Sequence, residues 1–450
     1  MKQVLLISYH FPPSMEVGGL RIANFSRSLP AFGWSPVVLT VKDKYIERID
    51  PGRMDGLGNT RVVKAGRAIS LSQIYLAMKK ALSSGKESSG GGSDDRGISS
   101  VHTISPGGET LRMKCRRVML AFMSLPDGER SWIIPAACKA IAEIRKGKID
   151  CIVTSAPPYS VHLVGLAVKI VTGVKWIADY RDQWTVKSRK SVYHTCTLSL
   201  AIENKLEEQV VRNADTVLAN TKNIRDAYRE RYDSEKTEKF VYLPNMIDSA
   251  VYDPYLGMGK YPDFTISHAG SLYFGRTPEP LFAAIRWLIQ ERRIGNDIRV
   301  KLVGNCTHVN GIPMGAVIDR YGLASQVDIS PMVPHAEALE IIRKSHLALL
   351  LAPDQPLQIP AKVYEYMGLG TRILAIAKEG ATRDLLGETG CGKAFDPDDT
   401  TGIGEFLMET MSGGDGNKKD GNRRIQELFG LPAVAGQLST ELDKLCGRSG

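Results

Sequence analysis

A lysine and a glutamate three residues apart, Lys362 and Glu365, form the pair with the clearest potential chemistry in this sequence. They follow a short apolar run, residues 346–351, that predicts a buried strand, and residues 372–377 predict a second one. Pro360 can open a helix between these strands, since proline suits the first helical turn. Lys362 and Glu365 would then share one face of that turn.

This spacing indicates a site for a nucleotide. The ammonium of Lys362 and the helix N-terminus could hold a phosphate group, while Glu365 could accept hydrogen bonds from ribose hydroxyls. Loops at the carboxyl ends of parallel strands are where open α/β sheets bind ligands. The alternative is that Lys362 is an ordinary solvated residue, because a lysine works against the helix dipole at this end. The spacing alone leaves both interpretations open.

A second cation follows another predicted strand. Residues 264–270 predict a strand that ends at Gly270, and a helix is expected over residues 278–293. Arg276 lies just before this helix, where its planar guanidinium could grip a pyrophosphate.

The N-terminal end of the chain has the same plan of strand, loop and helix. Residues 3–8 predict a strand, and the loop after it ends in Gly18 and Gly19, which would let backbone N–H groups approach a ligand closely. A plain turn is the alternative. The loop contains no G-x-G-x-x-G or P-loop pattern, so neither a dinucleotide site nor a P-loop site is indicated.

Two carboxylates flank an arginine at a third strand end. Residues 174–178 predict a strand, and Asp179 and Asp182 follow it on either side of Arg181. Such runs are commonly structural ion pairs. Their position at the carboxyl end of a strand favours a functional site.

Length and composition limit the class of protein. The 450 residues are too many for one ordinary core, so two large domains are expected. The net charge of +9 fits an anionic partner but does not choose among a nucleotide, a nucleic acid and a lipid surface. The seven cysteines include no Cys-x-x-Cys pair, which favours neither a zinc site nor a disulfide framework. No apolar run reaches membrane-spanning length, so a protein that is cytoplasmic or peripheral to a membrane is expected.

Two segments stand apart from the strand and helix pattern. Residues 83–108 are rich in serine and glycine and predict a mobile loop within the first domain. Residues 111–123 mix four basic side chains with large apolar ones. They could form an ordinary core helix or an interfacial helix that contacts the inner face of a membrane as a peripheral element.

Alternating strands and helices predict an α/β protein of two doubly wound halves. The expected division is residues 1–245 and 246–425, followed by a helical segment, 426–450, that could pack back on the first domain.

With Gly18-Gly19 and residues 179–184, 268–276 and 359–366 in this order, the sequence resembles the family 4 glycosyltransferases, especially the bacterial members that build surface polysaccharides. The resemblance covers roughly residues 1–400. It implies a GT-B fold, in which two Rossmann-like domains face a cleft and the second holds most of a nucleotide sugar. It also implies transfer with retention of configuration and without a metal or another cofactor. The implied partners are a nucleotide-sugar donor and a glycan or lipid-linked acceptor, not a nucleic acid.

The resemblance also assigns roles to single residues. Arg276 and Lys362 would neutralise the diphosphate during catalysis, and Asp179 lies where the family carries an acidic residue or a histidine near the reacting sugar. The expected substrate-binding residues are Gly18, Gly19, Asp182, Gly270 and Glu365.

The sequence departs from the family pattern in two places. The family's usual pair of glutamates has its first member eight residues before the second, and Leu357 occupies that position here. The lysine that often follows the Arg276 position is missing, and Lys362 could supply that charge. A sugar-nucleotide epimerase of the same fold and a non-catalytic sugar-nucleotide-binding scaffold therefore remain as alternatives.

Overall fold

The structure is a computed structural model that describes residues 2–54, 56–58, 60–68, 125–185, 197–273, 275–291, 293–295, 297–413 and 418–447. The predicted loop 83–108 and the predicted helix 111–123 lie outside these residues. The chain divides into two compact units, Met1–Ile22 with Ser35–Thr216, and Ala23–Trp34 with Val217–Gly450. The boundary expected near residue 245 stays a prediction.

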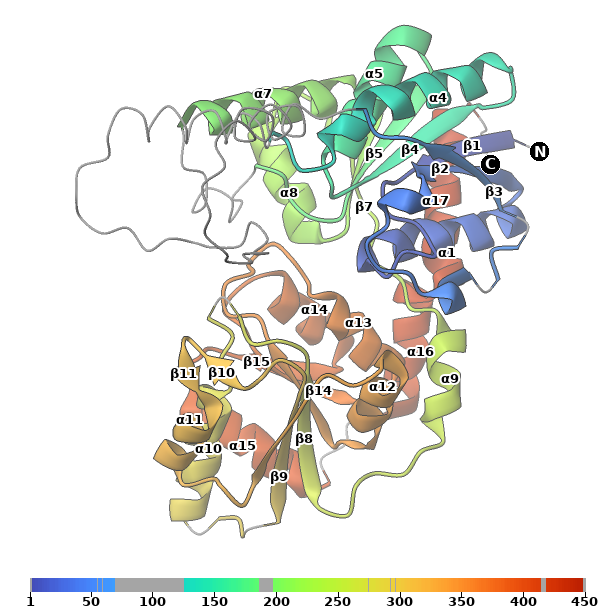
Figure 1. Ribbon diagram of the computed structural model, residues 1–450. Coiled ribbons are helices and arrows are strands. Elements are labelled where there is room, and N and C mark those ends of the chain that lie inside the picture. Colours follow the sequence, from blue (N-terminus) through green and yellow to red (C-terminus); the bar gives the residue numbers. More distant parts are fainter. Residues whose placement is uncertain are drawn as a thin grey trace, which may run out of the picture. The chain divides into compact units, whose positions relative to one another are not determined.

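The first sheet has seven strands in the order β3-β2-β1-β4-β5-β6-β7 (Figure 1). Their bounds are β1 (Lys2–Ile7), β2 (Trp34–Val41), β3 (Arg61–Ala65), β4 (Cys151–Ala156), β5 (Lys175–Tyr180), β6 (Thr216–Ala219) and β7 (Phe240–Tyr242). The pairings β1–β4, β4–β5, β2–β3 and β6–β7 are parallel. Every residue of β4 is buried, which is typical of parallel strands covered on both faces.

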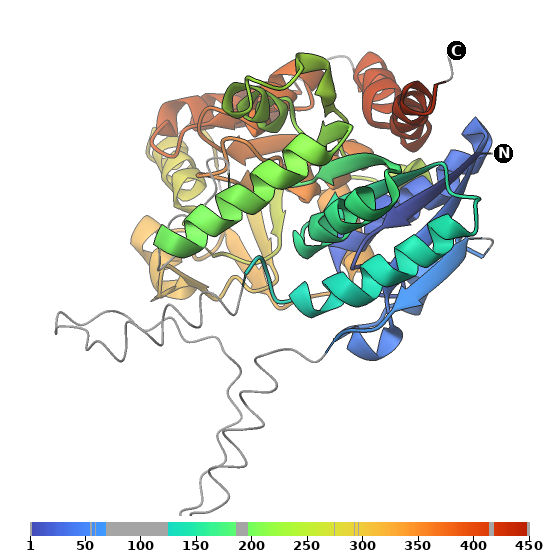
Figure 2. The same cartoon turned by 90° about the horizontal axis from the view of Figure 1, so that it is seen from above.

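Helices connect these strands. They are α1 (Leu20–Ser28), α4 (Ile133–Arg145), α5 (Ser160–Thr172), α7 (Thr197–Asn213) and α8 (Lys222–Arg231). Helix α5 packs between α4 and α7, and α4 and α5 run side by side in both views (Figures 1 and 2). Thr221 caps α8, because its hydroxyl accepts a hydrogen bond from the Ile224 N–H at 3.0 Å.

The second sheet has six strands in the order β12-β9-β8-β13-β14-β15. Their bounds are β8 (Phe264–Ala269), β9 (Ile298–Val303), β12 (Val327–Ser330), β13 (Leu347–Leu351), β14 (Arg372–Ile376) and β15 (Gly392–Phe395). All five neighbouring pairs are parallel. A short antiparallel pair, β10 (His308–Val309) and β11 (Ile312–Pro313), stands beside this sheet as a separate ribbon.

Two apolar clusters cover the two faces of the second sheet. One joins β-strand side chains to helices α10 (Glu279–Gln290), α11 (Met314–Tyr321) and α15 (Thr400–Met411). The other joins the opposite side chains to α9 (Ser249–Leu256), α12 (His335–Lys344), α13 (Ala361–Gly368), α14 (Ala381–Thr389) and α16 (Lys418–Phe429). The predicted α/β class with doubly wound parallel sheets is therefore confirmed.

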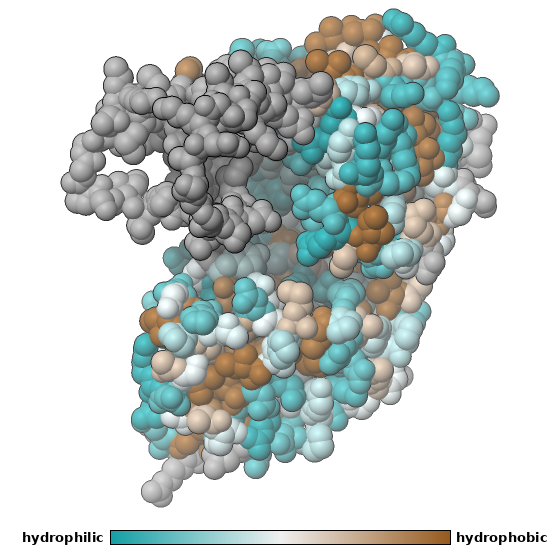
Figure 3. Space-filling model, viewed as in Figure 1, coloured by the Kyte–Doolittle hydropathy of each residue, from teal (hydrophilic) through white to brown (hydrophobic). Residues whose placement is uncertain are grey.

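The last helix of the described residues is α17 (Leu431–Leu445). Gly436 of this helix lies against the ring of Phe32, in the turn Leu29–Phe32 that follows α1, with 3.1 Å between the ring and the position of a glycine Cβ. On the face drawn in Figure 3, exposed apolar side chains form small groups separated by hydrophilic ones. Within the described ranges, no helix combines the length and the apolar character needed to cross a bilayer.

Candidate functional site

The predicted helix after β13 is present as α13, and Lys362 occupies its first turn. Pro360 precedes the helix, and one face of α13 is anchored in the core by Val363, Tyr364, Tyr366 and Met367. This packing leaves Lys362 at the carboxyl edge of the second sheet, with its ammonium next to Gly270 at the end of β8. Among the described residues, the Lys362 ammonium has no hydrogen-bond partner.

Gly270 makes room for that ammonium. A Cβ atom on Gly270 would lie 2.1 Å from Lys362 Nζ, which is far inside van der Waals contact. Gly270 also has a φ of +156°, in the region that favours glycine. A second glycine supports this arrangement, because a Cβ on Gly304, just after β9, would lie 2.3 Å from the Gly270 carbonyl oxygen. The two glycines thus bring the ends of β8 and β9 together beneath the Lys362 side chain.

Burial lowers the pKa of Lys362 from its ordinary value, and the charge of Arg276 lowers it further, whereas Glu365 opposes the shift. The Arg276 guanidinium carbon lies 4.3 Å from the centre of the Tyr273 ring, a distance suited to a cation–π contact. Glu365 Oε1 lies 3.3 Å from Nε2 of His335 at the start of α12. The second unit therefore brings together four residues predicted from sequence: Gly270, Arg276, Lys362 and Glu365.

This arrangement is suited to an anion. Two cationic side chains and the N-terminus of α13 lie at the carboxyl edge of a parallel sheet, where such folds bind ligands. A phosphate oxygen near Lys362 Nζ would receive its N–H groups and would offset the unfavourable burial of the ammonium.

We expect Gly270→Ala to weaken nucleoside-diphosphate binding by up to about 100-fold, the upper loss for a charged hydrogen bond. The new methyl group would displace the Lys362 ammonium, which is the end of a flexible side chain. Isothermal titration calorimetry measures this effect.

The matched control is Gly390→Ala. Gly390 has a φ of +66° but no atom within 4 Å of its Cβ position, so this variant carries backbone strain without displacing a side chain. It should lose about 1–3 kcal/mol of stability and keep its affinity. Equal affinities for Gly270→Ala and the wild type would contradict the role assigned to Gly270.

In the first unit, Asp179 lies at the end of β5 in a buried ion pair with Arg21 of α1. Arg21 Nε donates to Asp179 Oδ2 at 2.9 Å, and Arg21 Nη2 donates to Oδ1 at 3.0 Å. The Ser155 hydroxyl also donates to Oδ2 at 2.7 Å. Only 4% of the Arg21 side chain and 1% of the Asp179 side chain are exposed. These contacts tie α1, β4 and β5 together, and the catalytic role of Asp179 stays a prediction.

Arg181 explains why Gly18 is a glycine. Its guanidinium donates to the carbonyl oxygens of Gly18 and Pro157 and, through Nε at 3.3 Å, to that of Ala156. A Cβ on Gly18 would lie 2.8 Å from Arg181 Nη1. The charge of Asp182 acts on the same arginine and partly offsets the lowering of its pKa by burial.

Gly19 has a comparable internal constraint. A Cβ there would lie 3.0 Å from the Phe11 Cα atom. Close contacts within the protein are therefore enough to explain why both positions are glycine. That these glycines approach a ligand stays a prediction.

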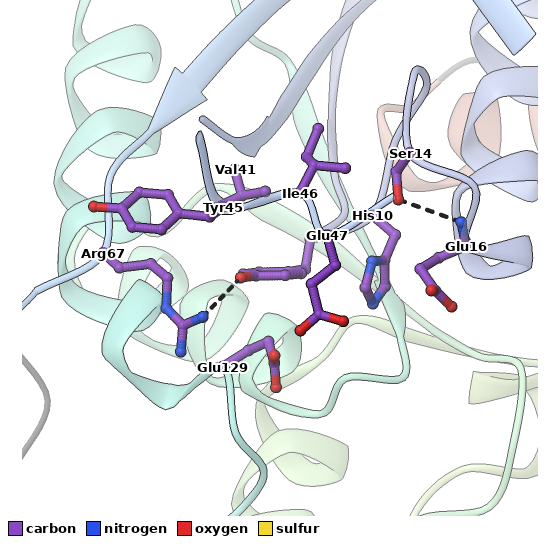
Figure 4. A pocket seen from close by; sticks show the side chains of 10 residues that line it. His10, Ser14, Glu16, Val41, Tyr45, Ile46, Glu47, Arg67 and Glu129 are labelled. Carbon is purple, nitrogen blue, oxygen red and sulfur yellow. Dashed lines mark hydrogen bonds between the residues drawn. The ribbon is translucent and has the colours of Figure 1, made fainter. Parts of the chain in front are cut away.

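The first unit also contains a pocket of about 210 Å³ that the sequence did not predict (Figure 4). It opens where β1, β2 and β3 end, again at the carboxyl edge of a sheet. Arg67 is held in place beside it, donating to the Tyr9 hydroxyl at 3.2 Å and to the Gly128 carbonyl at 2.7 Å. The lining residues are Tyr9, His10, Ser14, Glu16, Val41, Tyr45, Ile46, Glu47, Arg67 and Glu129.

Three glutamates give this pocket an acidic character. Burial, together with the neighbouring charge of Asp127, raises the pKa of Glu129. Burial lowers the pKa of His10, which keeps its imidazole neutral near pH 7. Carboxylates, a neutral imidazole and tyrosine rings are groups that hydrogen-bond and stack on polyhydroxylated ligands. The residues that line the pocket are scattered between positions 9 and 129 without a regular spacing, so the sequence contains no motif that predicts the pocket.

Residues 96–251 match the sequence profile of the family described as Glycosyltransferase Family 4. The predicted resemblance to the family 4 glycosyltransferases is therefore confirmed over this segment. A comparison with curated protein sequences gave no match.

Solved structures of low sequence identity share the fold of this chain. Sucrose-phosphate synthase from Thermosynechococcus elongatus is 15% identical, with a TM-score of 0.61 and full coverage of both chains. Anabaena HepE, solved with UDP, is 13% identical with a TM-score of 0.61 over 99% of this chain and 100% of its own. A Listeria monocytogenes protein assigned as a UDP-N-acetylglucosamine 2-epimerase is 11% identical, with a TM-score of 0.54 over 99% and 96%. The predicted GT-B fold is confirmed. A protein assigned as an epimerase has the same fold, so the fold does not identify the type of enzyme. The assignment as a glycosyltransferase rests on the match to the family profile.

Proposed function

We propose that this glycosyltransferase moves a sugar, with retention of configuration and without a metal ion, from a nucleotide diphosphate donor to a glycan or lipid-linked acceptor in polysaccharide biosynthesis. The observation that carries the proposal is the partly buried Lys362 side chain, whose ammonium lies next to Gly270 and close enough to Arg276 to be affected by its charge. Retention and the pathway follow from the family resemblance. That HepE has been solved with UDP and with UDP-glucose supports a nucleotide-sugar donor for the similar fold here.

In this proposal the second unit stabilises the leaving group. As the bond between the sugar and the diphosphate breaks, negative charge grows on the diphosphate oxygen. Lys362 and Arg276 would neutralise that charge, and a preorganised pair of cations lowers the barrier in this way. Glu365 would accept hydrogen bonds from the ribose hydroxyls, replacing its contact with His335.

The acidic pocket of the first unit is our candidate for the acceptor sugar. Its carboxylates would accept hydrogen bonds from hydroxyl groups, and they would repel a phosphorylated part of an acceptor. The pocket would therefore receive the sugar end of a glycan or lipid-linked acceptor and not its phosphate.

The decisive experiment begins with the donor. Nucleotide sugars based on UDP, GDP, ADP and TDP are compared by thermal unfolding at equal concentration, because a ligand that binds the native state raises Tm more the tighter it binds. The stabilising donor is then incubated with and without glycan acceptors, and nucleoside diphosphate and product are measured. A protein that is stabilised by a donor but never releases nucleoside diphosphate would contradict the proposal.

We expect transfer to survive excess EDTA. The proposal assigns neutralisation of the diphosphate to Lys362 and Arg276, so a divalent ion has no required role. Among the described residues, no group of three metal-ligating side chains is positioned to hold an ion. Transfer is measured after EDTA treatment and again after manganese or magnesium is added. Loss of activity that either ion restores would contradict the metal-independent mechanism.

A further inference from the structure

The unusual group next to Lys362 is His268, the penultimate residue of β8, with 4% of its surface exposed. Its Nδ1 atom lies 3.1 Å from the carbonyl oxygen of Leu349 on β13. A carbonyl can only accept, so Nδ1 carries the proton and Nε2 is left as an acceptor. Nε2 is buried and has no hydrogen-bond partner among the described residues. An unsatisfied buried acceptor is costly, so its presence calls for a reason.

Nε2 and the Lys362 ammonium face the same point. The position that a Cβ on Gly270 would occupy lies 3.4 Å from His268 Nε2 and 2.1 Å from Lys362 Nζ. One atom can only accept and the other can only donate, and a small rotation of the flexible lysine would join them. Burial and the nearby positive charge of Lys362 lower the pKa of His268 to about 4, so the imidazole is neutral near pH 7.

The other groups around Lys362 do not accept a hydrogen bond from its ammonium. Arg276 repels the ammonium, Glu365 attracts it as a charge without a hydrogen bond, and the Cys306 thiol has its pKa raised to about 11 by burial and so stays neutral. Cys306 Sγ instead donates to the Gly270 carbonyl at 3.3 Å. His268 Nε2 is thus the neutral acceptor that faces Lys362 within the described part of the site.

We propose that His268 is a positioning residue whose Nε2 accepts a hydrogen bond from the Lys362 ammonium and holds that cation above Gly270 for the donor diphosphate. The inference rests on the proposed function of the same site. In this inference the imidazole has two roles. It orients the Lys362 side chain, and it stabilises the protonated ammonium, which burial disfavours.

Two substitutions separate the two nitrogen atoms of His268. In His268→Asn the side-chain amide can still donate to Leu349 in place of Nδ1, but nothing reaches the position of Nε2. In His268→Gln the longer side chain brings an amide oxygen to that position. We expect His268→Asn to weaken UDP binding about three- to tenfold, with GDP, ADP and TDP tested in parallel, and His268→Gln to stay within about twofold of the wild type.

A double-mutant cycle tests whether His268 acts through Lys362. If it does, His268→Asn should change the affinity by less than about twofold when Lys362 is already alanine. The same loss in both backgrounds would overturn the proposal, because His268 would then act on the ligand or on the fold directly. No loss in the wild-type background would overturn it as well. Thermal unfolding of each variant shows whether it is folded.

A measurement without a nucleotide keeps the inference separate from the proposed function. An NMR titration of the Lys362 ammonium in the full chain should show a lower lysine pKa in His268→Asn, because removing the acceptor disfavours the charged form. The ammonium would then be lost at a lower pH than in the wild type. An unchanged titration overturns the inference. A shifted titration in a protein that binds none of the four nucleotides supports the His268–Lys362 contact and overturns the proposed function alone.

Discussion

Replacing Asp179 with alanine should lower the free energy of unfolding by about 3–5 kcal/mol, the usual loss when one partner of a buried ion pair is removed. The Arg21 side chain is 4% exposed, and its guanidinium would lose the carboxylate that receives two of its N–H groups. The Ser155 hydroxyl would lose its acceptor as well. Urea denaturation of the full chain measures the change.

The matched control is Asp43→Ala at the surface pair with Lys64. This pair is short, with 2.6 Å between Lys64 Nζ and Asp43 Oδ2, but its side chains are 40% and 53% exposed. Solvent screens such a pair, so its removal should change stability by no more than about 1 kcal/mol. Similar losses for Asp179→Ala and Asp43→Ala would show that burial does not govern the contribution of the Arg21–Asp179 pair.

Asp179→Asn separates a structural role from the predicted catalytic one. The amide oxygen can still accept from Arg21 or Ser155, so this variant should unfold with a smaller loss than alanine. Transfer is then assayed well below the Tm of the variant. A normal turnover number in the folded variant would show that the charge of Asp179 is not needed for catalysis.

Replacing Lys362 with alanine should weaken nucleoside-diphosphate binding by about 1.5–3 kcal/mol, the range for a hydrogen bond to a charged group, or roughly ten- to a hundredfold. Stability should not fall by a comparable amount. The substitution removes a partly buried ammonium that has no hydrogen-bond partner among the described residues, and desolvation already disfavours its charged form. Calorimetric titration with UDP and thermal unfolding measure the two effects.

Lys344→Ala is the matched control for Lys362→Ala. Lys344 lies in the last turn of α12, just before β13 begins, so it is at the amino edge of the sheet and pairs with Glu340. Its removal should leave the affinity unchanged. An equal loss in both lysine variants would indicate general electrostatic attraction and would contradict a specific phosphate contact at Lys362.

The elements around Lys362 could be predicted because each signal is local. Buried runs mark β13 and β14, and Pro360 marks the start of the helix between them. The parallel order of these strands then brings Lys362 to the carboxyl edge of the sheet, as expected. The helix after Arg276 is shorter than predicted and ends at Gln290, although the apolar spacing suggested residue 293.

Contacts between distant parts of the sequence could not be predicted in the same way. Arg21 and Asp179 are 158 residues apart, and nothing near either one indicates its partner. The apolar neighbours of His268 mark a buried strand but do not reveal that its Nε2 atom faces Lys362. These relationships depend on strand order, which a single sequence specifies only through its tertiary packing.

The three hydrogen bonds that Arg181 donates to carbonyl groups link three loops, so a change in one loop affects the other two. One guanidinium serves the loops that follow β1 and β4, and it belongs to the loop after β5. If one of these loops were exchanged alone, the partly buried Arg181 guanidinium would lose carbonyl acceptors that the remaining loops do not replace. These three loops should therefore be exchanged together when the protein is engineered. Chimaeras that exchange one loop should express less well than chimaeras that exchange all three.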